Sequence, residues 1–300
     1  MAKQMSIVPL EFAERPALEL RATAERIRVV PVEPGQRPRI EVESQRRDPA
    51  TLQVERSGET LVVTTDSTRA IASWVFGAVP FSALTLFVPQ NVRARITQDF
   101  GTLEVERLVG CDLELSASAG TIALSHLRGR LQVSVDSGTI TGEHLAGTFN
   151  VRTSAGSVKL GVDALDAGDH RFTTELGSVK LFLAPGQQVK FDSITSLGSS
   201  RISYPSVEGA PARVRLSAEL GSIRVKEGDA FIDERHGDWA DWQRLWHDAV
   251  ETVGGVISDA APKPNPQPVP EAELRKVLEL LQDGKINAQD AERLIRAMGR

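Results

Sequence analysis

A glycine followed by a hydroxyl residue recurs seven times in the second and third hundred residues of the 300-residue chain. The glycines of this main series are Gly101, Gly120, Gly138, Gly156, Gly177, Gly198 and Gly221. Their spacings are 19, 18, 18, 21, 21 and 23 residues, and a second series lies halfway between the first members: Gly110, Gly129 and Gly147. Such a repeat constrains the fold strongly, because each unit must bury its apolar face against the next one.

The positions around each main-series glycine have a fixed character. The next residue is always Thr or Ser, the one after it is aliphatic except at Ser200, and the residue two places before the glycine is polar. Residues at i and i+2 share one face of a strand, and glycine takes the positive φ of a tight corner. Each unit therefore predicts a short strand, with one face inward, bounded by a turn.

Stacking every second unit gives a mainly β fold, a single-stranded β-solenoid (β-helix) with coils of 18 to 23 residues. The aliphatic column becomes a continuous core, and the hydroxyl column becomes a ladder along one edge. The growing spacing predicts a cross-section that widens toward the C-terminal end. Ser200, which breaks the aliphatic column, predicts one inserted residue and hence a β-bulge.

Residues 96–228 carry these repeats, and residues 1–95 show short alternating runs without the glycine phrase. We expect those runs to form irregular strands that start and cap the solenoid. The segment 70–91 contains no charge, but Gly77, Pro80 and Pro89 interrupt it, and its second half alternates as a strand with one apolar face, formed by Leu84, Leu86 and Val88. We therefore predict no transmembrane span. The apolar loop before this strand is a candidate contact for a partner or a membrane surface through three residues: Trp74, Val75 and Phe76.

The period changes from 2 to 3.6 after residue 228, which predicts an amphipathic, acidic helix over 229–260. It carries three of the four tryptophans: Trp239, Trp242 and Trp246. Two interpretations remain open: the helix caps the end of the solenoid, or it binds a partner or a second copy. A proline-rich linker over 261–270 and a helical hairpin over 271–300 follow. The hairpin is too small to be stable alone, so its apolar side chains are candidate contacts: Leu278, Leu281, Leu294 and Ile295.

Composition and spacing argue against several kinds of site. The 35 basic and 40 acidic residues give a net charge of −5, which does not suit nucleic-acid binding. The only cysteine, Cys111, has no nearby basic partner and is expected to be inert. The five histidines lack metal-ligand spacing, although His126 and His144 lie one coil apart and could stack. Asp163, Asp166 and Asp169 are spaced as a conceivable calcium loop but do not fit the EF-hand pattern.

The repeats, preceded by TLFVPQNVRARI, resemble those of the bacterial adhesin-like "toastrack" β-repeat family, a domain of unknown function, over residues 10 to 228. The pattern ELRKVLELLQDGKINAQDAERLI in the last 30 residues resembles the short helical hairpin often attached to such domains. Here the hairpin is C-terminal, whereas it is more typical of the N-terminus. The resemblance implies a single-stranded β-helix and a link to envelope-stress or membrane-associated systems. It implies no catalytic residues.

The function expected from the sequence is that of a non-enzymatic structural or interaction scaffold whose helical tail mediates assembly or docks a protein partner. Catalytic residues, a cofactor, a metal and a small-molecule substrate are not predicted. A carbohydrate-active or carbohydrate-binding solenoid is the alternative, but aromatic residues are only 5% of the chain. A self-polymerising β-helix is a further alternative. The N-terminus has no apolar run long enough for a signal peptide, so we expect a cytoplasmic protein, with peripheral contact at the inner face of the membrane as an option.

Overall fold

The structure is a computed structural model that describes residues 4–44, 51–66 and 83–228. Within these ranges the chain forms one 11-stranded sheet and no helix. The strands are β1 (Gln4–Pro9), β2 (Ala17–Pro31), β3 (Arg39–Ser44), β4 (Thr51–Ser57), β5 (Thr60–Asp66), β6 (Ala83–Val88), β7 (Arg93–Glu106), β8 (Val109–Leu165), β9 (Gly168–Leu183), β10 (Val189–Ile202) and β11 (Ala212–Glu227).

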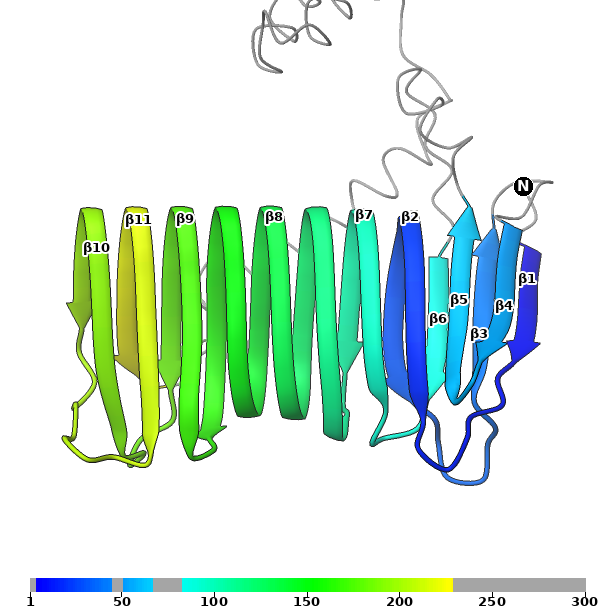
Figure 1. The fold of residues 1–300 in the computed structure, drawn as a ribbon, viewed down its shortest axis with the longest axis horizontal. Helices are drawn as coiled ribbons and strands as arrows, with labels where there is room; N and C mark the ends of the chain where they lie inside the picture. The colour runs from blue at the N-terminus through cyan, green and yellow to red at the C-terminus, as the bar shows by residue number, and fades with distance from the viewer. Residues whose placement is uncertain (1–3, 45–50, 67–82, 229–300) are drawn as a thin grey trace, which may run out of the picture. The chain divides into compact units, whose positions relative to one another are not determined.

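The main-series glycines stack on one another, which confirms the predicted β-solenoid. Gly101 is the Cα partner of Gly120, and Gly156 is the Cα partner of Gly177, in parallel pairs of strands. Strand β8 alone winds through several coils, with Gly138 packed against Gly120. Figure 1 shows the coils side by side from β7 through β8 to β9.

The predicted aliphatic column forms the continuous core of the solenoid. The side chains two residues after the glycines are fully buried in six coils: Leu103, Ile122, Ile140, Val158, Val179 and Ile223. Their stacking removes the apolar face of every coil from water, at about 25 cal/mol per Å² of apolar surface. The middle of each coil is therefore filled by side chains, and binding has to occur on its outer surface.

The last two coils do not follow the order of the sequence. Strand β11 pairs with β9 on one side and with β10 on the other, and Figure 1 shows it, in yellow, between them. The polarity of the inward-facing side chains explains this order. Leu216, Ala218 and Ile223 of β11 are buried, whereas β10 has hydroxyl residues at the corresponding positions. At the end of the stack the hydroxyls of Ser193 and Ser200 are 3.3 Å apart and exposed, so neither lies unpaired in the core.

Two details predicted from the repeat are wrong. Strands β10 and β11 stay in register from Gly198 through Ser200 to Ile202, without an inserted residue, so there is no β-bulge. The cross-section of the coils does not widen, because the strand starts at Gly168, Ala212 and Val189 are also in register. The additional residues of the longer repeats lie in connecting loops, such as 184–188 and 203–211.

The N-terminal strands extend the same sheet. Strand β2 pairs in parallel with β7 although it lacks the glycine phrase, and its other edge pairs with β5 and β6. Strands β1, β3 and β4 then add antiparallel pairs. Leu84, Leu86 and Val88 of β6 are buried, which confirms the strand predicted there. No helix of the described residues is long and apolar enough to cross a membrane.

Candidate functional site

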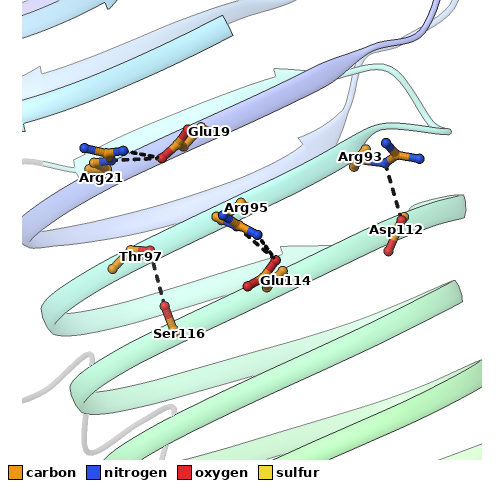
Figure 2. Close-up of polar contacts among 8 residues, drawn as sticks. All are labelled: Glu19, Arg21, Arg93, Arg95, Thr97, Asp112, Glu114 and Ser116. Atoms are coloured by element: carbon orange, nitrogen blue, oxygen red, sulfur yellow. Dashed lines mark hydrogen bonds and ion pairs between the residues drawn. The ribbon is translucent and has the colours of Figure 1, made fainter. Parts of the chain in front are cut away.

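The first strands of two neighbouring coils, in β7 and at the start of β8, present paired charges to solvent. Arg95 and Glu114, on neighbouring coils, are 2.7 Å apart, and Arg93 and Asp112 are 3.4 Å apart. Figure 2 shows both pairs. Exposed pairs of this kind contribute at most about 1 kcal/mol each. Opposite charges across neighbouring strands nevertheless avoid repulsion. At these pairs the face therefore offers little net charge to a ligand.

Near the C-terminal end of the stack, two cations of the first strands also have acidic partners. Asp169 is 3.3 Å from Arg215, and Lys190 is 2.5 Å from Glu208. A shallow hollow in this region is lined by both signs of charge, from Asp169, Lys190, Glu208 and Arg213. The acidic and basic side chains that line the hollow neutralise one another, so the hollow is a weak candidate for binding a charged ligand.

The second strands of the last four coils carry a row of like charges, which we call the basic row. It consists of Lys159 in β8, Lys180 in β9, Arg224 in β11 and Arg201 in β10, and each is the Cα partner of the next. Neighbouring strands lie about 4.8 Å apart, and like charges placed directly opposite one another are destabilising. Within the described residues, Lys180, Arg224 and Arg201 form no ion pair with a carboxylate. The basic row therefore imposes an electrostatic cost that a bound anion would relieve.

The basic row is confined to one end of the solenoid. In the same column of the preceding coils, Glu104 pairs with Arg26 at 2.8 Å, and the next two positions are Ala123 and Thr141. At the C-terminal end a second hollow opens beside the basic row. It is lined by residues of β10 and β11 and the loop after β10: Arg201, Ser203, Arg224, Val225 and Lys226. Its charged groups are all positive, unlike those of the first hollow.

Three exposed leucines form a second row, the leucine row, directly before the glycine corner. Leu176, Leu220 and Leu197 are 52%, 48% and 68% exposed and are Cα partners on consecutive coils. The central coils have small residues in this column: Ala119, Ser137 and Ala155. The leucine row and the basic row thus flank the same corner of β9, β11 and β10. Serine hydroxyls stand between them, at Ser178, Ser222 and Ser199.

The contact residues predicted from the sequence lie outside the described residues, and they stay predictions. They are Trp74, Val75, Phe76, Trp239, Trp242, Trp246, Leu278, Leu281, Leu294 and Ile295. Sequence reasoning missed both the leucine row and the basic row. The signal was present in the aligned repeats, where the position before the glycine changes from Ala or Ser to Leu, and the third position after it changes from Ala or Thr to Lys or Arg.

The two histidines that lie one coil apart in the repeat do stack. The rings of His126 and His144 have centroids 4.7 Å apart, and both residues take a φ of 52° at the corner opposite the glycine column. Both side chains are exposed, and Nδ1 of His144 lies 3.2 Å from Asp163. These histidines are part of a solvent-facing turn.

The three aspartates of the conceivable calcium loop have separate partners. Asp163 lies beside His144, Asp169 pairs with Arg215, and the backbone carbonyl of Asp166 accepts a hydrogen bond from Nε2 of His170. The described residues contain no group of three or more His, Cys, Asp or Glu side chains that could hold a metal ion. The geometry thus gives no support to a calcium loop formed by these three side chains.

Cys111 is buried, and its thiol lies 3.5 Å from the carbonyl oxygen of Arg128. Burial raises its pKa to about 11, so almost no reactive thiolate exists near neutral pH. We expect the folded protein to react with Ellman's reagent at pH 8 far more slowly than the protein unfolded in guanidinium chloride. Equal rates in the two states would show that the strand around Cys111 opens readily.

His170 is fully buried, accepting a hydrogen bond from the backbone N–H of Phe149 at Nδ1 and donating one from Nε2 to Asp166. Burial lowers its pKa below the ordinary value of 6.5. Between the lowered pKa and 6.5 the unfolded chain binds more protons than the folded one, so stability falls as the pH falls through this window.

Denaturant unfolding at a series of pH values measures this contribution of His170. We expect the free energy of unfolding to decrease below about pH 6.5, and the His170→Gln variant to lose part of that decrease. The variant His126→Gln, at an exposed position, is the matched control and should keep the wild-type slope. Identical slopes in all three proteins would contradict the assignment to His170.

No protein-family model and no curated protein matches the chain. Among solved structures, it is similar to a "putative cell adhesion protein" from Clostridium sporogenes, with 13% identity over 76% of this chain and 100% of the other and a TM-score of 0.39. It is also similar to a "putative lipid binding protein" from Parabacteroides distasonis (11% identity, 75% and 97% coverage, TM-score 0.38) and to a "putative adhesin" from the same species (10%, 74% and 97%, 0.37). Two of these names agree with the adhesin-like resemblance of the repeats. At these TM-scores the likenesses carry no inference about function.

Proposed function

We propose that the protein is a non-enzymatic interaction scaffold, in which a stack of β-coils presents fixed rows of side chains to a binding partner. The leucine row is the observation that carries the proposal. Three large apolar side chains, each about half or more exposed, stand in register on consecutive coils. Exposed apolar side chains that gather in one place typically mark an interaction site, whereas isolated ones do not.

The construction of the solenoid supports a scaffold. Each row is held by parallel backbone pairing between coils, so the spacing of its side chains is set by the sheet. The interior is filled by the aliphatic column, and the two hollows described above lie on the outside. The interior groups that could act as a nucleophile or a base, Cys111 and His170, are buried and hydrogen-bonded. These features suit binding rather than catalysis.

The proposal extends to the C-terminal residues on sequence grounds. The tryptophan-rich segment 229–260 and the hairpin 271–300 would mediate assembly or dock a protein partner, and the resemblance of the repeats suggests a bacterial envelope-stress or membrane-associated setting. A cytoplasmic location, with contact at the inner face of the membrane, fits this picture. Purification of the protein lacking 261–300 under native conditions tests the role of the hairpin, since an unchanged set of co-purifying proteins would exclude it.

Site-specific photo-crosslinking in cells tests the scaffold proposal. A benzophenone amino acid is placed at Leu220 in one variant and at Ser137, in the same column of a central coil, in the other. We expect crosslinks from position 220 to a protein or a lipid, and few or none from position 137. An absence of crosslinks from position 220, or equal crosslinks from both positions, would contradict an interaction site at the leucine row.

A further inference from the structure

We infer that the leucine row and the basic row together form a docking surface for a lipid bilayer that contains anionic phospholipids. This inference rests on the proposed scaffold function and names the chemistry of its partner. The two rows flank one corner of β9, β11 and β10, so a single flat surface applied to that corner could meet both.

The leucine row supplies the apolar part of such a contact. Leu176, Leu220 and Leu197 stand side by side at the corner, and Ile194, earlier in β10, is 70% exposed. Peripheral proteins bind bilayers by burying apolar side chains at the boundary between headgroups and acyl chains. A continuous row of leucines at a protruding corner meets this requirement, whereas the small residues of the central coils do not.

The basic row supplies the electrostatic part. Lys180, Arg224 and Arg201 form no ion pair with a carboxylate in the described ranges. Arg224 and Arg201 also line the second hollow, whose charged groups are all positive. Each Lys or Arg near an anionic membrane surface adds to the attraction. The phosphate groups of the lipids would relieve the repulsion between neighbouring cations, and the serine hydroxyls between the rows can donate further hydrogen bonds.

Acidic residues before the leucine row mark one edge of this docking surface. Glu175 and Glu219 precede the leucine row, on the side of the first strands. Glu175 is paired with Arg152 at 2.7 Å, whereas the side chain of Glu219 is exposed. The bilayer would therefore contact the corner and the second strands, and the acidic side would face away from it.

The charge of the docking surface also distinguishes a bilayer from other candidate partners. A second copy placed with its basic row against this one would bring two sets of cations together, which is unfavourable. A soluble polyanion would use the basic row but gain nothing from three exposed leucines. An anionic bilayer makes use of both rows, and a protein segment with one acidic and one apolar face is the competing occupant that the test has to exclude.

Vesicle flotation of the full-length protein tests the inference. One set of vesicles contains phosphatidylcholine alone, and the other contains equal parts of phosphatidylcholine and phosphatidylglycerol. We expect the wild-type protein to float with the anionic vesicles and to remain unbound with the neutral ones. Binding should weaken as salt is added, because screening reduces the electrostatic part.

Two triple variants separate the contributions of the rows. Replacing the three cations in Lys180→Gln, Arg224→Gln and Arg201→Gln should weaken binding to anionic vesicles roughly 100-fold. Replacing the leucines in Leu176→Ser, Leu220→Ser and Leu197→Ser should also abolish flotation. All six side chains lie on the outer surface, and far-ultraviolet circular dichroism should show an unchanged β signal.

Matched controls make the same chemical changes elsewhere. The variant Arg93→Gln, Arg95→Gln and Arg215→Gln removes three cations from the first-strand face, and Met5→Ser with Ile7→Ser removes exposed apolar side chains from β1. Both controls should float like the wild-type protein. Equal loss in a control and its test variant would overturn the assignment to the two rows.

The remaining outcomes also decide against the inference. Failure of the wild-type protein to bind anionic vesicles, or equal binding to neutral ones, would exclude an anionic bilayer as the occupant. If the leucine variant still binds and only the cation variant fails, the surface recognises anionic groups without inserting, as it would for a soluble polyanion. Protein crosslinks from position 220, combined with no vesicle binding, would keep the scaffold function and overturn the lipid inference.

Discussion

Gly138→Ala is expected to lower the free energy of unfolding by about 4 kcal/mol or more, at the upper end for single substitutions. Gly138 has a φ of +147°, a conformation that L side chains rarely adopt. A Cβ at this position would collide with the carbonyl oxygen of Gly120 in the neighbouring coil. Relief requires the coils to separate, and that separation would break backbone hydrogen bonds and core contacts on both sides.

The effect of Gly138→Ala can be read from the denaturant midpoint followed by far-ultraviolet circular dichroism. Gly209→Ala is the matched control, because Gly209 also has a positive φ, +76°, but no atom lies within 4 Å of the position of the added methyl. Only backbone strain remains there, which should cost about 1 kcal/mol. Similar losses at the two positions would mean that close stacking of the glycines is not what holds the coils together.

Phe172→Ala is expected to cost about 3–5 kcal/mol of stability. Phe172 is fully buried in β9 and stacks on Phe149 of the preceding coil, with ring centroids 6.1 Å apart. The neighbouring coils are tied by backbone hydrogen bonds, so they can move little to fill the space that the ring leaves. The substitution therefore removes buried apolar surface and leaves a cavity beside Phe149.

Phe100→Ala provides the comparison for Phe172→Ala. The ring of Phe100 is 45% exposed at the glycine corner, and its removal should change stability by less than about 1 kcal/mol. Both variants can be followed by the same denaturant titration. A loss at Phe172 no larger than that at Phe100 would show that the interior of the solenoid is loosely packed.

The columns of the repeat were enough to predict the solenoid, because a single physical requirement acts in every coil. The residue two places after the glycine points inward and has to be apolar, as it is from Leu103 to Val179. The same reasoning led to the strand over Leu84, Leu86 and Val88. Coils of this kind are local and repetitive, so a short sequence window contains the information that fixes them.

The order of the last two coils was not predicted, because the order of the glycines along the chain was assumed to be their order in the stack. The clue was the hydroxyl residues at the inward positions of 189–202, which suit an end coil better than a middle one. Ser200 was interpreted as a local bulge, although Ser193 and Thr195 break the inward pattern in the same strand. A coil with polar inward residues belongs where solvent can reach them.

The N-terminal coil was hidden for a different reason. In β2, Glu25 occupies the position of Gly101, and no hydroxyl follows it, so the glycine phrase is absent. The coil is recognisable only from its apolar alternation, in Leu18, Leu20, Ile27 and Val29. The leucine row and the basic row do not follow from the fold pattern, because outward-facing columns do not determine the fold. The compositional change in these columns along the stack carries information about binding.

The coil order β9, β11, β10 is the central claim, because it sets both the polar end of the stack and the rows at the proposed binding surface. Engineered disulfides test it directly. Ser178 and Ser222 are Cα partners, whereas Ser178 and Ser199 are separated by β11, at roughly 10 Å, beyond the reach of a disulfide. Cys111 should not interfere, since its thiol is buried with a pKa of about 11.

Mild oxidation followed by mass spectrometry should detect an intramolecular disulfide in the variant Ser178→Cys with Ser222→Cys, and none in Ser178→Cys with Ser199→Cys. The variant Ser199→Cys with Ser222→Cys is the positive control, because these two strands are neighbours in either order. A disulfide between positions 178 and 199, without one between 178 and 222, would contradict the coil order and the surface built on it.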